Sequence, residues 1–231
     1  MGMSKSKAVG KRVEARAERV RKILPILKRT YPGAKCSLEF ETPLELLIAT
    51  ILSAQCTDER VNAVTTGLFK KHRSAAELAR VSQEELEKDI QSAGFFRNKA
   101  KSLRGMAAAL VERHVGKVPA TMEELVELPG VGRKTANVVL GNGFGKSVGV
   151  VVDTHVGRLS ERLGLTTNTD PVKVEQDLME VVPKEEWTEW AHLMIYHGRK
   201  VCVARKPRCG ECVLLEWCPT GRSGAGGEHH R

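Results

Sequence analysis

Residues 128–136 read "LPGVGRKTA", and this short stretch decides the fold. Helix-favouring sequence precedes it in "TMEELVEL" and follows it in "RKTANVVL", which stops at Gly141 and Gly143. Gly130 and Gly132 permit a tight turn with positive φ and leave the backbone uncovered. The stretch therefore predicts two helices joined by a Gly-x-Gly turn, with free backbone N–H groups at the start of the second helix. Such a turn can bind a phosphate without reading any base.

Two other interpretations of the same stretch need weighing. "GVGRKT" resembles a nucleotide-binding P-loop, but Arg133 replaces the glycine before the lysine and Leu128 replaces the first glycine. A helix rather than a strand also precedes it. The other interpretation is a plain helical hairpin with glycines at its turn and no ligand. The flanking Leu-Pro and Arg-Lys-Thr favour the phosphate site over this alternative.

Outward from the hairpin, the chain reads as one helix after another. Thr42 is the expected N-cap of an apolar helix with Pro43 at its first position, and Ser74, Ser82 and Thr121 precede acidic first turns. The only candidate strand, "SVGVVVD", merges into the amphipathic segment "VDTHVGRLSERLG". No alternating segment longer than a few residues is present. We therefore predict an all-α fold.

Composition restricts the class of protein. The 231 residues are 41% apolar, enough to bury a real core, and no apolar run reaches the roughly 18 residues of a membrane span. The N-terminus lacks the apolar centre of a signal peptide. Glu14 and Glu18 argue against a transit peptide, although organelle targeting stays open. We expect a cytoplasmic protein, in which clustered cysteines bind metal more often than they form disulfides.

The charge favours an anionic partner. The formal net charge is +9, and residues 1–30 contain ten Lys and Arg but two Glu, so the remainder is close to neutral. This is a weak indication of nucleic-acid binding, because a basic arm can be only a solvated terminus. Aromatic residues make up 4% of the chain, which argues against a single-strand binder with extended base-stacking platforms.

Four of the six cysteines lie within seventeen residues, as Cys202-x6-Cys209-x2-Cys212-x5-Cys218. Zinc sites usually pair two short Cys-x-x-Cys knuckles, and only one is present here. Bacterial ferredoxins use a different spacing and take their fourth ligand from elsewhere in the chain. From chemistry alone the stretch predicts a four-thiolate site for iron–sulfur or zinc, with disulfides as a weaker third possibility.

These motifs together resemble the DNA base-excision glycosylases. "LPGVGRKTANVVL" followed by "VDTHVGR" is similar to their helix–hairpin–helix and Gly/Pro-rich loop ending in Asp. The cysteine spacing resembles that of the endonuclease III branch, whose cysteines hold a [4Fe-4S] cluster. The resemblance spans about residues 36–218. It implies a monomer that acts on double-stranded DNA with damaged bases or abasic sites, in the bacterial cytoplasm and associated with the nucleoid.

The resemblance also implies a domain arrangement. Residues 38–146 would form a six-helix domain containing the hairpin, and residues 147–219 a helical [4Fe-4S] domain. Residues 1–37 would form a basic helix packed on the cluster domain, and a cleft would separate the two domains. We expect residues 220–231 to be a disordered tail, because they are Gly-rich and polar.

Two residues match the family's catalytic positions. Lys134 corresponds to the nucleophilic lysine of the bifunctional members, which attacks the sugar C1′, expels the base and leaves a Schiff base. The alternative is a lysine that only contacts phosphate. Asp153 corresponds to the carboxylate that faces the sugar and stabilises the oxocarbenium-like charge. Its alternative role is that of a simple N-cap.

Further residues match DNA contacts. Gln55 in "ILSAQCTDERVN" corresponds to the side chain that fills the space left by the flipped base. Phe95 in "SAGFFRNKAKSL" corresponds to the wedge opposite, although the family's wedge is often aliphatic and both Phe95 and Phe96 could be core residues. The remaining expected DNA contacts are Gly130, Gly132, Arg133 and His155, and Arg205, Lys206 and Arg208 in the loop between the first two cysteines.

The predicted function is a bifunctional DNA glycosylase and abasic-site lyase for oxidised pyrimidines. An adenine mismatch glycosylase shares the fold and cluster but lacks the lysine and usually carries Gln-Gln-Thr where this chain has "SAQCTD". Other monofunctional relatives are disfavoured by Lys134. A non-catalytic duplex-binding module would not require Lys134 and Asp153 together, and an iron–sulfur electron carrier would not need the hairpin.

Overall fold

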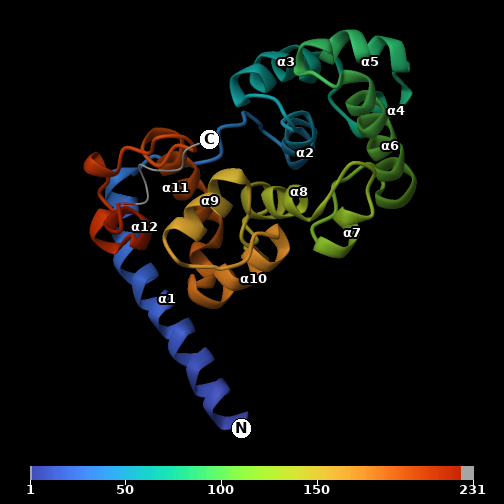
Figure 1. Ribbon diagram of the computed structural model, residues 1–231. Helices are drawn as coiled ribbons and strands as arrows, with labels where there is room; N and C mark the ends of the chain where they lie inside the picture. The colour runs from blue at the N-terminus through green and yellow to red at the C-terminus, as the bar shows by residue number, and fades with distance from the viewer. Residues whose placement is uncertain (1, 225–231) are drawn as a thin grey trace. The chain divides into compact units, whose positions relative to one another are not determined.

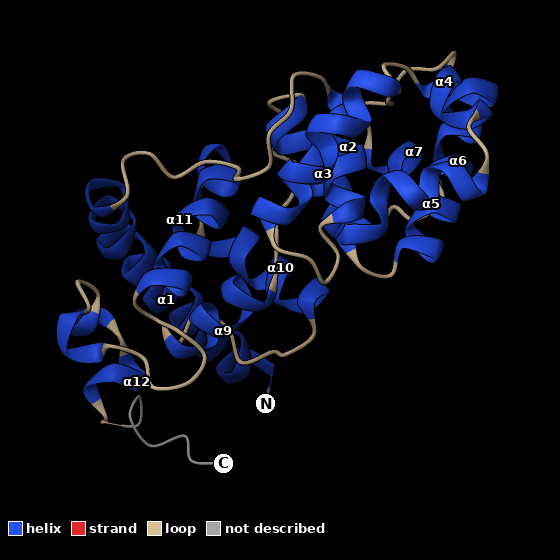
Figure 2. Cartoon of the chain, turned by 90° about the horizontal axis from the view of Figure 1, so that it is seen from above, coloured by secondary structure: helices blue, strands red, loops and turns tan. Residues whose placement is uncertain are grey.

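The computed structural model describes residues 2–224, with side chains from residue 10 onward. Every regular element in this part of the chain is helical, and no strand occurs in it (Figures 1 and 2). The all-α prediction is therefore confirmed. Residues 147–153, the candidate strand, are irregular.

The chain divides into two compact units, residues 36–148 and residues 1–35 with 149–231. We call the first the hairpin unit and the second the cysteine unit. The hairpin unit contains α2 (Pro43–Leu52), α3 (Asp58–Lys71), α4 (Ala75–Arg80), α5 (Gln83–Ile90), the 3-10 turn η1 (Gln91–Ala93), α6 (Phe96–His114), α7 (Met122–Val126), α8 (Arg133–Val138) and the π-helical turn η2 (Val139–Gly143). The cysteine unit contains α1 (Gly2–Thr30), α9 (Thr154–Arg162), α10 (Pro171–Val181), η3 (Lys184–Glu186), α11 (Trp187–Lys200), η4 (Cys209–Glu211), η5 (Leu215–Trp217) and α12 (Pro219–Arg222).

Side-chain caps set the helix starts in the hairpin unit. The hydroxyls of Thr42, Ser74, Ser82 and Thr121 each accept a hydrogen bond from a backbone N–H in the first turn of the following helix. All four predicted caps are confirmed. These contacts satisfy donors that a helix N-terminus otherwise leaves without a partner. α2 follows Thr42 and buries every residue from Leu46 to Leu52, so it is the central helix of this unit's core.

α1 packs on the rest of the cysteine unit against α10 and α11. Its apolar stripe of Val20, Ile23, Leu24 and Leu27 is buried. Arg19 Nη1 donates to the carbonyls of Leu163 (2.9 Å) and Gly164 (3.0 Å), where α9 ends.

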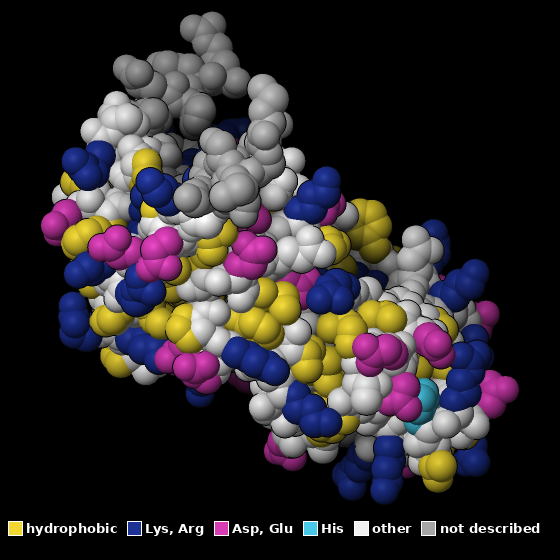
Figure 3. Space-filling view, turned by 90° about the horizontal axis from the view of Figure 1, so that it is seen from below, with side chains coloured by type: hydrophobic (Ala, Val, Ile, Leu, Met, Phe, Trp, Pro, Cys, Tyr) yellow, Lys and Arg dark blue, Asp and Glu magenta, His cyan; other side chains and the backbone are white. Residues whose placement is uncertain are grey.

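Several basic residues of α1 already have acidic partners within the unit. Arg16 lies 3.7 Å from Asp177, and Lys28 lies 2.6 Å from Glu186 and 3.0 Å from Glu189. On the face drawn in Figure 3, basic and acidic side chains are interspersed rather than gathered by sign. Part of the positive charge of the N-terminal helix is therefore neutralised by ion pairs within the same unit.

The predicted disordered tail needs correction at its start. We expected disorder from residue 220, but residues 219–222 form the short helix α12, with Pro219 at its first position. The Sγ of Cys218 caps this helix by accepting from the Gly221 N–H at 3.3 Å. The sequence pattern did not predict a cysteine cap. The rest of the predicted tail, residues 225–231, lies outside the described residues.

Candidate functional site

The hairpin turn requires glycine at one of its two glycine positions for steric reasons. Gly130 has φ +77°, and a Cβ placed there would lie 2.8 Å from Ser102 Cβ. Gly132 has φ −96° and caps α8, and a Cβ placed there would meet nothing within 4 Å. Leu128 and Val131 are buried and anchor the turn to the core. The predicted helix–turn–helix is confirmed, with open space around the backbone of Gly132.

Lys134 lies in the first turn of α8 and is exposed. Ala136 and Asn137 in the same helix are buried, so α8 is fixed on the core while its N-terminal side chains face solvent. Arg133, also exposed, precedes Lys134. The hairpin unit therefore presents an accessible amine beside an open backbone turn.

Asp153 is the N-cap of α9 in the cysteine unit. Its Oδ1 accepts hydrogen bonds from the backbone N–H groups of His155 (2.9 Å) and Val156 (2.8 Å). Asp153 therefore has the N-cap role that the sequence analysis gave as its alternative. A carboxylate held by two amides at a helix N-terminus is well fixed in orientation, which is also what a charge-stabilising group requires. Lys134 and Asp153 belong to different units.

His155 packs against α11 rather than standing free. Its Nδ1 accepts from Arg158 Nη2 at 3.2 Å, and burial lowers the pKa of its ring. A Cβ on Gly198 of α11 would lie 3.0 Å from that same Nδ1. Arg158 also donates to the carbonyls of Gly198 (3.1 Å) and Cys202 (3.0 Å). These contacts assign both side chains to helix packing, and a DNA contact by His155 stays a prediction.

Gln55 and Phe95 share an unusual backbone conformation. Their φ angles are 52° and 48°, in the left-handed region that non-glycine residues rarely adopt. Phe95 is 65% exposed, whereas Phe96 is half-buried against the core. Of the two phenylalanines, only Phe96 is a core residue. Strained, exposed side chains of this kind occur preferentially at functional sites.

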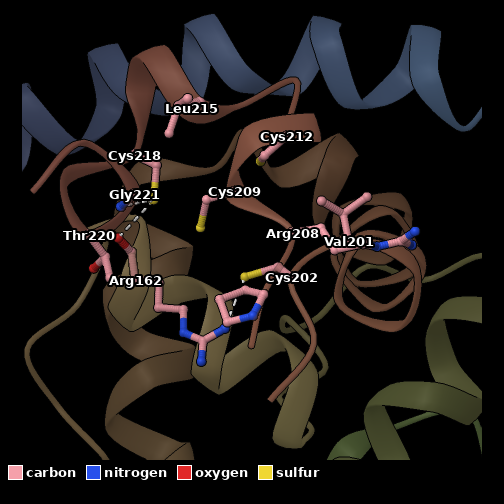
Figure 4. A pocket seen from close by; sticks show the side chains of 11 residues that line it. Arg162, Val201, Cys202, Arg208, Cys209, Cys212, Leu215, Cys218, Thr220 and Gly221 are labelled. Carbon is pink, nitrogen blue, oxygen red and sulfur yellow. Dashed lines mark hydrogen bonds between the residues drawn. The ribbon is translucent and has the colours of Figure 1, made fainter. Parts of the chain in front are cut away.

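The four clustered cysteines line one pocket (Figure 4). None of them is in a disulfide. Four thiols around one shared space are a donor set that can hold an iron–sulfur cluster or zinc. The donor set therefore fits the group implied by the spacing.

Arg162 in α9 holds the first cysteine and the loop after it. Its Nη1 donates to Cys202 Sγ at 3.3 Å and to the Val203 carbonyl at 2.9 Å, and its Nη2 donates to the Ala204 carbonyl at 2.9 Å. Sequence reasoning missed this residue. It lies one helical turn after Arg158, so the pair of arginines on one face of the helix was the available signal.

His197 in α11 contacts a second cysteine. Burial lowers the pKa of His197 to about 4, so its ring is neutral at physiological pH. Its Nδ1 lies 2.9 Å from the Tyr31 hydroxyl and its Nε2 lies 3.4 Å from Cys212 Sγ. If the hydroxyl donates to Nδ1, the single ring proton is on Nε2 and points to the sulfur. Burial raises the pKa of the Cys212 thiol to about 11, and a bound metal would favour its thiolate form.

The loop between the first two cysteines exposes Arg205 and Lys206. Lys206 has φ 53°. Arg208 is engaged within the loop, since its guanidinium donates to the Lys200 carbonyl and lies 3.5 Å from Glu211. Arg205 and Lys206 are thus the more available cations of the three.

Comparison with known proteins agrees with this geometry. Residues 48–184 match the family model of the HhH-GPD superfamily base excision DNA repair protein, and residues 202–218 match the iron-sulfur binding domain of endonuclease III. The chain is 54% identical over 213 residues to the endonuclease III of Synechocystis sp., covering 92% of this chain and 97% of that protein. It is 48% identical over 193 residues to the endonuclease III of Bacillus subtilis, covering 83% of this chain and 88% of that protein.

The chain is also similar to solved structures of DNA repair glycosylases. A trapped endonuclease III–DNA covalent intermediate superposes with a TM-score of 0.86 at 45% identity, covering 90% of this chain and 98% of that chain. A thermostable thymine-DNA glycosylase superposes with a TM-score of 0.81 at 21% identity, a likeness of fold alone. The chain carries a [4Fe-4S] cluster, and it belongs to the endonuclease III family of base-excision DNA repair proteins.

Proposed function

We propose that this base-excision glycosylase and lyase removes oxidised pyrimidines from duplex DNA, with Lys134 as its nucleophile. The observation that carries the proposal is the exposed amine of Lys134, directly after a hairpin turn with open space at Gly132. In support, a relative 45% identical to this chain has been solved as a trapped DNA covalent intermediate.

The reaction follows from the chemistry of a primary amine. The neutral Nζ of Lys134 attacks C1′ of the sugar, and the base leaves with the electron pair of its glycosidic bond. After the attached amine loses a proton, its lone pair breaks the C1′–O4′ bond, and the ring oxygen takes up a proton, which gives the Schiff base. Removal of a proton from C2′ then expels the 3′ phosphate by β-elimination. Lys134 is exposed in the free protein, so its amine is accessible to the sugar of a bound DNA. Asp153 would stabilise the positive charge that develops on the sugar and accept a proton from the amine.

The other predicted residues would bind and open the duplex. The turn at Gly130 and Gly132 would contact phosphates through backbone N–H groups, with Arg133 beside it. Gln55 and Phe95 would occupy the space left by the flipped base. Arg205, Lys206 and Arg208 would bind phosphates, Arg208 the least freely, and His155 would lie at the edge of the interface.

The four cysteines Cys202, Cys209, Cys212 and Cys218 would hold the [4Fe-4S] cluster. When bound, the cluster supplies a covalent cross-link for its loop and a redox-active centre. We further propose that residues 38–146 and 147–219 act as separate domains with the cleft between them, in a monomeric protein of the bacterial cytoplasm. Among the described residues, no helix is long and apolar enough to span a membrane.

Borohydride trapping tests the proposal. The substrate is a duplex with one thymine glycol, and the proteins are wild type, Lys134→Ala and Lys117→Ala, an exposed lysine of the same unit. We expect a covalent adduct with wild type and Lys117→Ala and none with Lys134→Ala. Base release without an adduct in wild type would make the protein monofunctional and Lys134 a phosphate contact. If neither base release nor adduct appears, on this lesion or on an abasic site, a non-catalytic clamp becomes the better description.

A further inference from the structure

Lys99 is a buried charge in the hairpin unit, away from the proposed catalytic residues in sequence. It lies in α6 and is 6% exposed. Its Nζ donates to two backbone carbonyls, those of Leu52 and Ala93, each at 2.8 Å. Burial lowers the pKa of its ammonium, because removing the charge from water disfavours the protonated form. An apolar side chain of the same length would avoid this desolvation, so core packing alone does not explain a lysine here.

The two carbonyls belong to the segments that carry Gln55 and Phe95. Leu52 is the last residue of α2, and the chain then turns through Gln55. Ala93 is the last residue of η1, and Gly94 and Phe95 follow with φ 69° and 48°. Lys99 contacts the second segment twice, because its backbone N–H also donates to the Phe95 carbonyl at 3.1 Å. Lys99 therefore links the starting points of the two exposed loops that contain Gln55 and Phe95.

The chemistry of an ammonium suits this link. It carries three donors on a compact charge, so it can bind carbonyls from two directions at once. The Leu52 carbonyl is also at the C-terminal end of α2, where the helix dipole attracts a cation. A neutral side chain could not hold both carbonyls with comparable strength, since hydrogen bonds from charged donors are about twice as strong as neutral ones.

We propose that Lys99 is a positioning residue that fixes the loop of Gln55 and the loop of Phe95 at one spacing, so that both side chains enter the duplex together. This inference rests on the proposed function, because it assumes that these two side chains occupy the gap left by the flipped base. Lys99 itself does not contact DNA in this role. It acts by limiting the motion of two loops that separately would lose orientation during base flipping.

The test uses Lys99→Met, which keeps the length of the side chain and removes its charge, with Lys88→Met as the control on an exposed face of α5. Base flipping is followed by the fluorescence of 2-aminopurine placed beside a thymine glycol, and excision by single-turnover kinetics. We expect Lys99→Met to lose most of the flipping signal and between about tenfold and about 100-fold of its excision rate. Lys88→Met should behave as wild type. Cleavage of a preformed abasic site should fall less, since no base has to be flipped.

A double-mutant cycle separates positioning from general damage to the fold. If Lys99 acts through the two loops, its substitution should have little further effect on a protein that already carries Gln55→Ala and Phe95→Ala. An equal loss in both backgrounds, or wild-type flipping by Lys99→Met, would overturn the inference. If Lys99→Met does not fold, Lys99→Gln retains two amide donors and is measured in the same cycle. Failure of wild type to flip or excise thymine glycol would instead contradict the proposed function.

Discussion

Gly130 and Gly132 stand two positions apart in the hairpin, but only Gly130 requires glycine for the fold. Gly130 has a positive φ and no room for a side chain beside Ser102. Gly132 has an ordinary φ and open surroundings. At Gly130 the requirement comes from the fold itself, whereas at Gly132 the surrounding residues leave room for a side chain, so a substitution there tests whether a ligand approaches the backbone. Substitutions at the two positions should therefore separate an effect on stability from an effect on DNA binding.

Alanine at each position tests this separation. Gly130→Ala should lower the free energy of unfolding by about 1–3 kcal/mol, because it combines a left-handed backbone with a steric clash. Gly132→Ala should change it by less than about 0.5 kcal/mol but weaken binding to undamaged duplex, since its methyl group would occupy the path of a phosphate. Thermal unfolding and fluorescence anisotropy measure the two effects. Wild-type affinity in Gly132→Ala would show that no phosphate approaches this turn closely.

Asp153 combines an observed structural role with a proposed chemical one, and two substitutions divide them. Asn keeps an oxygen that can accept from the His155 and Val156 amides but loses the charge. We expect Asp153→Asn to unfold at nearly the wild-type temperature and to excise thymine glycol about 100-fold more slowly. Asp153→Ala should in addition lose about 1 kcal/mol of stability with the cap. Rapid excision by Asp153→Asn would leave this residue as an N-cap only.

At the scale of helices and loops, local chemistry was predictable and long-range contact was not. The caps at Thr42, Ser74, Ser82 and Thr121 were predicted because donor and acceptor lie three residues apart. Lys99 reaches across 47 residues to Leu52, and Tyr31 across 166 residues to His197. No single-sequence pattern encodes such pairs, so these buried polar contacts were missed. The short helix at 219–222, which Cys218 caps, was missed for a different reason, because Gly and polar residues there indicated disorder.

The same contrast holds within the candidate site. Lys134, Asp153 and the cysteines were selected from motifs whose spacing is local, and the structure places the cysteines around one pocket. Phe95 and Phe96 could not be distinguished, because adjacent identical residues carry no periodicity. The structure distinguishes the two phenylalanines, because Phe96 packs on the core and Phe95 is exposed at the start of α6.

α9 couples the candidate catalytic carboxylate to the cysteine loop, because Asp153 begins this helix and Arg162 ends it. We expect Arg162→Met to lose its cluster faster than wild type, since the Cys202 sulfur and two loop carbonyls lose their donors. Iron and sulfide content and visible absorbance, followed during incubation with a chelator, measure the loss. Arg29→Met, at an exposed position of α1, is the control. Equal rates of cluster loss in the two variants would show that Arg162 does not stabilise the loop.

At the scale of the whole molecule, the segment that contains the four cysteines differs from the hairpin unit in what stabilises it. The hairpin unit has a continuous apolar core around α2. In the cysteine unit, the segment 202–218 has two 3-10 turns as its only regular structure and buries Leu214 as its only core side chain. A segment with so little apolar burial needs a cross-link to hold its shape, and the cluster provides one. A cluster bound by the four cysteines would also fix both ends of the basic loop that contains Arg205 and Lys206.

The exposed cations of this loop belong to a protein of net charge +9, so a local phosphate contact has to be distinguished from a general positive field. Lys206→Glu should weaken binding to damaged and undamaged duplex alike and reduce the slope of log K against log salt by about 0.9 for each phosphate that the variant no longer neutralises. Lys117→Glu changes the net charge equally at an exposed position in the other unit. A fixed phosphate contact predicts a smaller slope for Lys206→Glu only, whereas a general positive field predicts the same change for both variants. Loss confined to damaged DNA would place Lys206 in lesion recognition instead, because phosphates are identical in the two duplexes.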